Sequence, residues 1–325
     1  MRAIQQHEYG QVDQLALVDI DLPAPGPDQV LIRVHAASVN MADWHLMTGE
    51  PLLARLALGV KAPKQQVRGV DLAGVVEQVG EAVTDFQPGD RVFGCADGAF
   101  ADFALASPKR IAALPAGVSF EQAATLGTAA RTAQQALRAA GIAAPGSGAG
   151  RSVLVIGAAG GVGSFAVQLA VLAGATVTGV CSTAKLDFVR GLGAAEAIDY
   201  TQGPVTGRFD VVVDIAGARP IREGLELVTD RGTLVIVGGE GGGALMGPSS
   251  RMMQAPFASL FSKRKVLGVF QTERRDDLEA LAHLVATGAL TPAIEQVLPL
   301  EQAPQAIAHL AAGRARGKTV LSIIG

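Results

Sequence analysis

The chain has 325 residues, of which 49% are hydrophobic and 18% charged, a composition typical of a globular protein with room for about two domains of ~150 residues. Thirty acidic side chains against 27 basic ones give a net charge of −3, so no basic field favours nucleic acid or an acidic membrane as a partner. Two cysteines are too few for a disulfide framework. The first residues lack the apolar core of a signal peptide, so we expect a cytoplasmic protein.

The first part of the chain, residues 1–122, alternates short apolar runs with turn signals, which predicts a β-rich domain. Strand-like runs lie at 30–36, 71–79 and 91–93. Residues 51–64 are an apolar, basic insert with a broken helical pattern. A surface helix and a lid over a pocket remain equal alternatives for this insert.

The second part, residues 123–272, alternates strand-like and helical segments. Six apolar runs are predicted as strands, near 153–156, 175–180, 196–199, 210–215, 233–237 and 265–270. With short helices joining the first four, this order predicts an α/β fold with a doubly wound parallel sheet. The stretch 152–183 carries no charge, but a glycine cluster divides it into strand, helix and strand, so we interpret it as a buried unit and expect no membrane span.

The tail, residues 273–325, is predicted to contain helices at 276–287 and 302–312 and a last strand at 319–323. That strand follows the sixth strand of the sheet by about fifty residues. We therefore expect it to return to the amino-terminal domain, so that 1–122 and 273–325 together form one discontinuous domain.

A glycine-rich motif, VLVIGAAGGVG at 153–163, stands between a buried strand and a helix. In the G-x-G-x-x-G register the first glycine is replaced by Ala158, while Gly160 and Gly163 are kept. We expect the backbone of Ala159, Gly160, Gly161 and Val162 to bind the pyrophosphate of a dinucleotide at the helix start, where the helix dipole favours an anion. An empty tight turn is the alternative.

The choice of dinucleotide is predicted from the end of the second strand of this sheet. An NAD site has an acidic residue there for the ribose hydroxyls, whereas this chain has Cys-Ser-Thr-Ala-Lys at 181–185. Ser182, Thr183 and Lys185 are suited to a 2′-phosphate, so we expect NADPH as the cofactor. Alternatively, Lys185 stands in the solvated first turn of the next helix.

Several motifs together resemble the medium-chain dehydrogenase/reductase superfamily, in its zinc-independent quinone oxidoreductase branch. They are Val-Asn-x-x-Asp at 39–43, the run from Gly69 to Gly80, Pro-Gly-Asp-Arg-Val at 88–92, the loop at 158–163, Leu-Gly-Ala at 192–194, Ile-Asp-Tyr at 198–200 and Gly-Lys-Thr-Val at 317–320. The resemblance covers nearly the whole chain. It implies a GroES-like β-rich catalytic domain and a Rossmann domain for the cofactor.

The resemblance also implies that no metal is bound. Zinc alcohol dehydrogenases of this superfamily carry a catalytic cysteine near Asn40 and a Gly-His-Glu triplet where Gly69-Val70-Asp71 stands here. Cys95 is alone where a four-cysteine loop would lie. Tetrahedral zinc needs three or four such ligands, so we expect no metal site.

By the same resemblance, Asn40 is expected beside the nicotinamide carboxamide or the acceptor oxygen, and Thr128 near the nicotinamide. His45 replaces a tyrosine common in quinone reductases, which makes it a candidate acid or orienting group near neutral pH. A packed histidine with no chemistry is the alternative. The remaining cofactor contacts that the resemblance implies are Tyr200 with Lys185 at the 2′-phosphate, Val237, Gly238, Gly239 and Phe270 along the cofactor, and a basic residue of the tail, Lys318, with Arg314 and Arg316 as alternatives.

The predicted function is that of an NADPH-dependent, zinc-independent oxidoreductase that passes hydride to a small-molecule quinone or another α,β-unsaturated carbonyl. The alternatives are a zinc-free alcohol/aldehyde or enoyl-thioester oxidoreductase and a non-catalytic NADPH-binding sensor. The resemblance further implies a homodimer in which the strands at 265–270 pair edge to edge.

Overall fold

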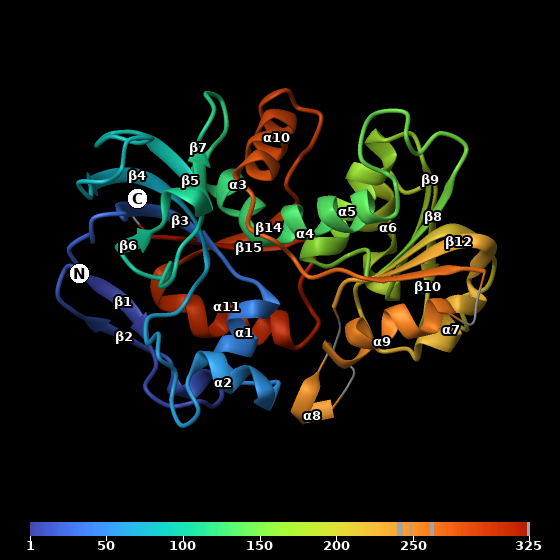
Figure 1. Ribbon diagram of the computed structural model, residues 1–325, viewed down its shortest axis with the longest axis horizontal. Helices are drawn as coiled ribbons and strands as arrows, with labels where there is room; N and C mark the ends of the chain where they lie inside the picture. The colour runs from blue at the N-terminus through green and yellow to red at the C-terminus, as the bar shows by residue number, and fades with distance from the viewer. Residues whose placement is uncertain (239–242, 248, 261–262, 324–325) are drawn as a thin grey trace. The chain divides into compact units, whose positions relative to one another are not determined.

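In the computed structural model, the described residues are 1–238, 243–247, 249–260 and 263–323. They divide into two compact units, Met1–Arg131 with Thr272–Gly325, and Thr132–Gln271 (Figure 1). The first boundary thus falls at Arg131 rather than at residue 122, where the prediction put it. The helical pattern after residue 119 belongs to the first unit, because α3 (Phe120–Ala124) packs on β3 and β4 of its sheet.

The first unit contains a seven-stranded sheet in the order β14-β15-β3-β4-β5-β7, with β6 paired to β3, and a separate antiparallel pair, β1-β2. The strands are β1 (Arg2–Gln5), β2 (Ala16–Asp19), β3 (Val30–Ser38), β4 (Asp71–Val79), β5 (Arg91–Cys95), β6 (Phe103–Ala106), β7 (Ile111–Ala113), β14 (Ile294–Pro299) and β15 (Lys318–Ser322). β15 pairs with β3, with Val320 opposite Ser38. The predicted return of the last strand to the amino-terminal domain is therefore confirmed.

Helices and turns of the first unit pack around this sheet. They are η1 (Val12–Gln14), α1 (Met41–Thr48), η2 (Leu52–Ala54), α2 (Arg55–Leu58), η3 (Pro108–Arg110), α3, the π-helical η4 (Leu126–Ala130), α10 (Arg275–Ala286), η6 (Leu300–Gln302) and α11 (Ala303–Ala311). Residues 51–64, the predicted insert, supply η2 and α2. Alternating apolar residues of β3 and β4, among them Ile32 and Leu72, form the core with Ile4, Phe100 and Ile307.

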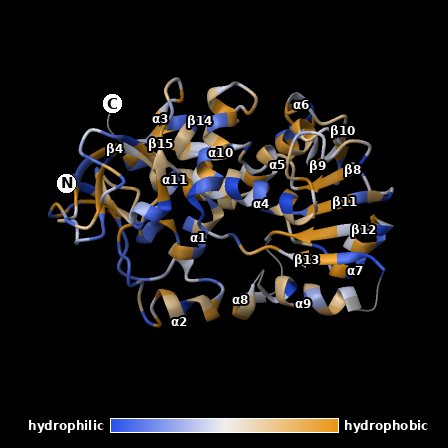
Figure 2. Ribbon diagram, turned by 45° about the horizontal axis from the view of Figure 1, so that its top comes forward, coloured by the Kyte–Doolittle hydropathy of each residue, from blue (hydrophilic) through white to orange (hydrophobic). Residues whose placement is uncertain are grey.

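The second unit is built on a six-stranded sheet in the order β10-β9-β8-β11-β12-β13, and every neighbouring pair is parallel. Its strands are β8 (Ser152–Ile156), β9 (Thr176–Cys181), β10 (Glu196–Asp199), β11 (Phe209–Asp214), β12 (Val228–Ile236) and β13 (Lys265–Gly268). Its helices are α4 (Arg131–Ala139, at the boundary), α5 (Gly161–Leu172), η5 (Thr183–Lys185), α6 (Leu186–Gly191), α7 (Ile221–Glu226), α8 (Gly243–Met246) and α9 (Ser249–Leu260). The apolar strands at the centre of this sheet are visible in Figure 2. The predicted doubly wound sheet is confirmed.

One predicted connection in this sheet is wrong. A helix was expected between each of the first four strands, but residues 200–208, all of them described, form turns and an extended segment between β10 and β11. The connection passes β9 and β8 to reach β11, a distance of about 15 Å at ~4.8 Å per strand. Nine residues reach that far in extended form, so no helix is needed.

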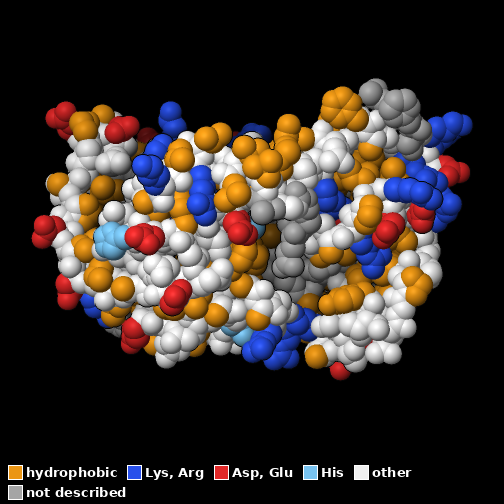
Figure 3. All heavy atoms as spheres, turned by 90° about the horizontal axis from the view of Figure 1, so that it is seen from below, with side chains coloured by type: hydrophobic (Ala, Val, Ile, Leu, Met, Phe, Trp, Pro, Cys, Tyr) orange, Lys and Arg blue, Asp and Glu red, His pale blue; other side chains and the backbone are white. Residues whose placement is uncertain are grey.

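Acidic and basic side chains are both scattered over the face seen in Figure 3, as the balanced composition suggests. Among the described residues, no helix is both long and apolar enough to cross a membrane.

The turn before α5 allows a test of the packing that forms the second unit. A Cβ on Gly163 would lie 2.1 Å from the carbonyl oxygen of Gly157, a backbone atom held at the end of β8. We expect Gly163→Ala to lower the free energy of unfolding by ~1–3 kcal/mol, because the turn and α5 must separate. Gly203→Ala is the control, since a Cβ there meets nothing within 4 Å. Equal effects of the two substitutions in chemical denaturation would contradict this packing.

Candidate functional site

A buried carboxylate, Asp71 at the start of β4, joins several elements of the first unit. Its side chain is fully buried and accepts hydrogen bonds from Asn40 Nδ2 (3.0 Å), Ser38 Oγ (3.4 Å) and Cys95 Sγ (3.4 Å). It also accepts from the backbone N–H of Thr128 (3.0 Å) and from Thr128 Oγ1 (2.6 Å). A buried charge of this kind is tolerated only where donors replace its water.

The π-helical segment η4 places Thr128 so that both its amide and its hydroxyl face Asp71. Gly127 permits this approach, because a Cβ there would lie 2.6 Å from Asp71 Oδ1. π-Helical turns are rare in proteins overall, but those that occur are often found at functional sites. Here the irregular turn serves the contact between Thr128 and the carboxylate.

The side chain of Asn40, just before α1, is fixed at both ends. Its Nδ2 donates to Asp71 and to the Ser38 carbonyl (3.2 Å), and its Oδ1 accepts from Lys318 Nζ (2.6 Å). An ammonium only donates and a carboxylate only accepts, so the amide has one orientation that satisfies both neighbours. Both hydrogens of the amide are thereby used within the protein.

Lys318 was expected near the cofactor, and the structure places its side chain in the core of the first unit. It is 2% exposed, and Nζ donates to the Val39 carbonyl (2.9 Å) as well as to Asn40. Burial lowers the pKa of Lys318, while Asp71 and Asp43 oppose that shift. Sequence reasoning missed this role, because 278 positions separate Lys318 from Asn40 and the pairing depends on β15 lying beside β3.

Asp43, in the first turn of α1, is a second buried carboxyl in this region. Its Oδ2 accepts from the backbone N–H of Asn40 (2.7 Å), which caps the helix start. Burial raises the pKa of Asp43 to about 7, with the Asn40 hydrogen bond opposing the shift and Asp71 adding to it. Near neutral pH this carboxyl is therefore divided between its charged and neutral forms.

Of the three predicted catalytic residues, the structure brings Asn40 and Thr128 together on Asp71. His45 lies further along α1, half-buried, with its ring edge-on to Trp44 at 5.3 Å between centroids. The role of His45 as an acid stays a prediction.

In the second unit, the predicted pyrophosphate turn joins β8 to α5 at the carboxyl end of the sheet. Gly160 is the N-cap of α5, and a Cβ there would meet only the Gly157 carbonyl oxygen, at 3.5 Å. Ala158 occupies the position of the first glycine without a clash, because Gly179 opposite it on β9 has no side chain. Ala159 is buried, while Gly160, Gly161 and Val162 are half-buried. An open turn before a helix start fits the pyrophosphate of a dinucleotide.

The predicted 2′-phosphate corner differs from the sequence interpretation in one respect. No carboxylate was expected there, but Asp199, at the end of β10, accepts hydrogen bonds from Thr183 Oγ1 and Thr201 Oγ1, the latter at 2.7 Å. These bonds lower the pKa of Asp199, so it is charged at neutral pH. Thr183 and Tyr200 are exposed, and Ser182 and Lys185 are half-exposed. The corner thus holds a cation, hydroxyls and a carboxylate.

The remaining predicted cofactor residues follow β12 and β13. Val237 is 9% exposed and Gly238 is half-buried, whereas the side chain of Phe270 is 58% exposed. Gly239 lies outside the described residues. The cofactor roles of all four stay predictions.

Comparison with known proteins places the chain in a family. Residues 26–130 match the alcohol dehydrogenase GroES-like domain, and residues 192–321 match the family described as zinc-binding dehydrogenase. The chain is 34% identical to the chloroplastic quinone-oxidoreductase homolog of Spinacia oleracea, over 99% of this chain and 98% of that protein. It belongs to the quinone oxidoreductase branch of the medium-chain dehydrogenase/reductase superfamily.

Other members of this superfamily show a similar likeness. The chloroplastic NADPH-dependent alkenal/one oxidoreductase of Arabidopsis thaliana is 31% identical, over 99% of this chain and 79% of that protein. The structure of the Escherichia coli quinone oxidoreductase complexed with NADPH superimposes with a TM-score of 0.84 at 25% identity, and covers 99% of this chain and 100% of that one. This chain is accordingly an oxidoreductase with a GroES-like and a Rossmann domain.

The description of one matched family implies zinc, and the residues of this chain do not fit that metal. Among the described residues, no group of three or more His, Cys, Asp or Glu side chains has an arrangement that could hold a metal ion. Cys95 Sγ accepts from Arg131 Nη2 (3.1 Å) and donates to Asp71. Burial raises the pKa of this thiol, and both hydrogen bonds keep its sulfur engaged within the protein.

The raised pKa of Asp43 predicts how the stability of this oxidoreductase depends on pH. The folded state keeps the proton up to about pH 7, whereas an aspartate in the unfolded chain loses it near pH ~3.9. The free energy of unfolding should therefore fall as pH rises from about 4 to about 7, by at most ~1.4 kcal/mol per pH unit from this group. Asp43→Asn retains an acceptor for Asn40 and should remove this loss.

Chemical denaturation of the wild type and Asp43→Asn at pH 5 and pH 8 measures the difference. The exposed Asp28→Asn is the control and should behave as the wild type. If the variant at position 43 shows the wild-type change between the two pH values, Asp43 does not carry a raised pKa in the folded state.

Proposed function

We propose that this chain is an NADPH-dependent, zinc-independent reductase that transfers hydride to a quinone or another α,β-unsaturated carbonyl. The observation that carries this proposal is the closed hydrogen-bond network of Asp71, Asn40, Thr128 and Lys318. Asn40 and Asp71 stand at the sequence positions where zinc alcohol dehydrogenases carry their metal-binding motifs. The polar atoms of the network bond to one another and to Ser38, Val39 and Cys95.

A reductase of conjugated carbonyls has less need of a metal than an alcohol dehydrogenase. An alcohol must lose a proton from oxygen as hydride leaves, which a metal assists by stabilising the alkoxide. A quinone or enone accepts hydride without that step, because conjugation spreads the developing negative charge. The names of the spinach and Arabidopsis relatives, a quinone oxidoreductase homolog and an alkenal/one oxidoreductase, support this acceptor class.

The cofactor supplies a hydride, and the residues of the chain bind, orient and protonate. The backbone of Ala159 to Val162 holds the pyrophosphate at the start of α5. Asp71 and Lys318 keep Asn40 and Thr128 in one geometry, so this part of the site does not reorganise during transfer. One proton must follow the hydride to give the hydroquinone or saturated carbonyl, and we assign it to the His45 ring or to water.

NADPH is favoured by Ser182, Thr183, Lys185 and Tyr200, and by the E. coli relative that was crystallised with it. Asp199 acts against this preference, because its charge repels a 2′-phosphate. We infer that the chain accepts both dinucleotides and prefers NADPH by a modest margin. The cytoplasmic location and the homodimer predicted from the sequence belong to the proposal as well.

Initial rates of NADPH and NADH oxidation, with a small benzoquinone and a short enone as acceptors, test the proposed activity. We expect turnover of at least one acceptor class, with kcat/KM for NADPH about tenfold above that for NADH, a difference of ~1.4 kcal/mol. Tight binding of NADPH without turnover of either acceptor class would contradict the proposal and favour a non-catalytic sensor.

Two substitutions at the 2′-phosphate corner should move the cofactor preference in opposite directions. Lys185→Ala should raise KM for NADPH several-fold with little change for NADH, because a cation facing the phosphate is lost. Asp199→Asn should increase the NADPH/NADH ratio of kcat/KM several-fold, because a repulsive charge is lost while Thr183 keeps a partner. The exposed Asp187→Asn, on the helix that follows, is the charge-matched control. An unchanged ratio in both test variants would place the 2′-phosphate elsewhere.

A further inference from the structure

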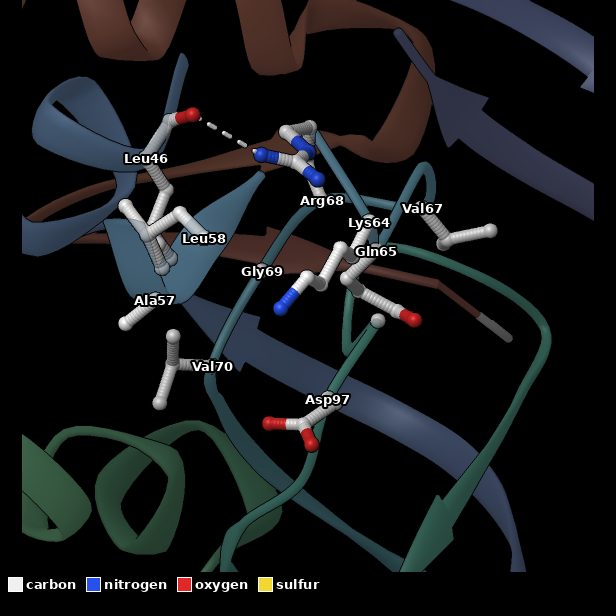
Figure 4. A pocket seen from close by; sticks show the side chains of 11 residues that line it. Leu46, Ala57, Leu58, Lys64, Gln65, Val67, Arg68, Gly69, Val70 and Asp97 are labelled. Carbon is white, nitrogen blue, oxygen red and sulfur yellow. Dashed lines mark hydrogen bonds between the residues drawn. The ribbon is translucent and has the colours of Figure 1, made fainter. Parts of the chain in front are cut away.

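A cavity of about 210 Å³ lies within the first unit, beside α1 and α2 (Figure 4). Its walls come from the end of α1, from α2, from the segment 64–70 before β4 and from the loop after β5. The apolar part of the lining is Leu46, Ala57, Leu58, Val67 and Val70. Residues 51–64, for which a surface helix and a lid were both open, thus supply one wall of a cavity.

Two cations line the cavity, together with the polar side chains of Gln65 and Asp97. Arg68 is 3% exposed, and its Nη1 donates to the Leu46 carbonyl (3.0 Å), while its buried Nε has no hydrogen-bond partner among the described residues. Lys64 is exposed at the rim, and Figure 4 shows its ammonium directed into the space between the walls. An arginine this deeply buried with an unsatisfied donor is costly unless a ligand or ordered water completes it.

The carboxylates near the cavity offset only part of these charges. Asp97 lines the opposite wall, but its Oδ1 forms an ion pair with Arg110 Nη1 at 2.9 Å. Asp43 interacts electrostatically with Arg68 but is not part of the cavity lining. An anion that enters the cavity therefore meets the cations Arg68 and Lys64. The carboxylate in the lining, Asp97, is already paired with Arg110.

The shape of the cavity is held by the backbone around Arg68. Gly69 has φ +94°, and a Cβ there would lie 2.4 Å from the Phe100 ring, so only glycine allows the segment to turn against that ring. The backbone N–H of Arg68 donates to the Ile4 carbonyl (2.9 Å) and its carbonyl accepts from Phe100 (2.8 Å). The guanidinium thus projects from a fixed backbone, as a recognition group requires.

We propose that this cavity binds the carboxylate end of the acceptor, so that the preferred substrates are small α,β-unsaturated carbonyl compounds that carry a carboxylate. Arg68 donates to the carboxylate from its free N–H groups, Lys64 adds a second donor at the rim, and the apolar walls enclose the carbon skeleton. The volume is below the ~300–1,000 Å³ typical of sites for drug-sized ligands, which limits the enclosed part to a single ring or a short chain. The inference rests on the proposed reductase function and specifies its substrate class.

Matched acceptors test the substrate class. With NADPH, the wild type should reduce a short enone acid with kcat/KM at least tenfold above that for its methyl ester. Arg68→Met, which retains an apolar stem of similar length, should lose most of this preference. Because the Lys64 ammonium lies at the rim, Lys64→Met should lose a smaller part of the preference for the acid. This variant tests the proposal if Arg68→Met does not fold. A wild type that reduces acid and ester equally would overturn the proposal.

A binding measurement separates failure of this inference from failure of the proposed function. Titration calorimetry of the whole chain with benzoate and with benzamide needs no turnover. We expect benzoate to bind more tightly to the wild type and the difference to disappear in Lys64→Met and Arg68→Met together. If no acceptor is reduced but benzoate binds more tightly than benzamide, the reductase proposal fails and the carboxylate site stands. If acceptors are reduced and benzoate binds no better than benzamide, only the proposed carboxylate site fails.

Discussion

The buried carboxylate of Asp71 is the constraint on which the first unit depends. Taking an unpaired carboxylate out of water costs several kcal/mol, so each of its donors must be held in place. β3 ends at Ser38 and leads to Asn40, β5 ends at Cys95, and the π-helical turn presents Thr128. The ends of elements far apart in the sequence are therefore fixed by one group. This requirement explains the π-helical turn at 126–130, because the turn places the amide and hydroxyl of Thr128 where they donate to Asp71.

The same network determines what chemistry the unit can support. Asp71 and the Ser38 carbonyl accept from the side-chain N–H groups of Asn40, and Lys318 donates to its Oδ1, so Asn40 acts as a rigid, oriented group. A site built this way holds its dipoles fixed before the reactants arrive, which suits hydride transfer to a conjugated carbonyl. Cys95 bonds to Arg131 and Asp71, and burial raises the pKa of its thiol.

The sequence predicted most of the fold because its signals are local. Apolar runs located all six strands of the parallel sheet, and the glycine motif located the turn before α5. Prediction from the sequence failed for hydrogen bonds between residues that are distant in the chain. Thr183 donates to Asp199 across neighbouring strands, and Lys318 reaches Asn40 only because β15 lies beside β3. The boundary at Arg131 was missed because a helical pattern does not tell which sheet the helix covers.

We propose that a hydrogen-bonded network, rather than a metal, organises the reaction site. The most direct test of this proposal is a zinc titration of the chelator-treated chain, with bound metal measured by elemental analysis and NADPH oxidation by a benzoquinone followed in parallel. We expect far less than one bound zinc per chain and the same turnover before and after chelation and zinc addition. One zinc bound per chain, with turnover that disappears on chelation and returns with zinc, would contradict it.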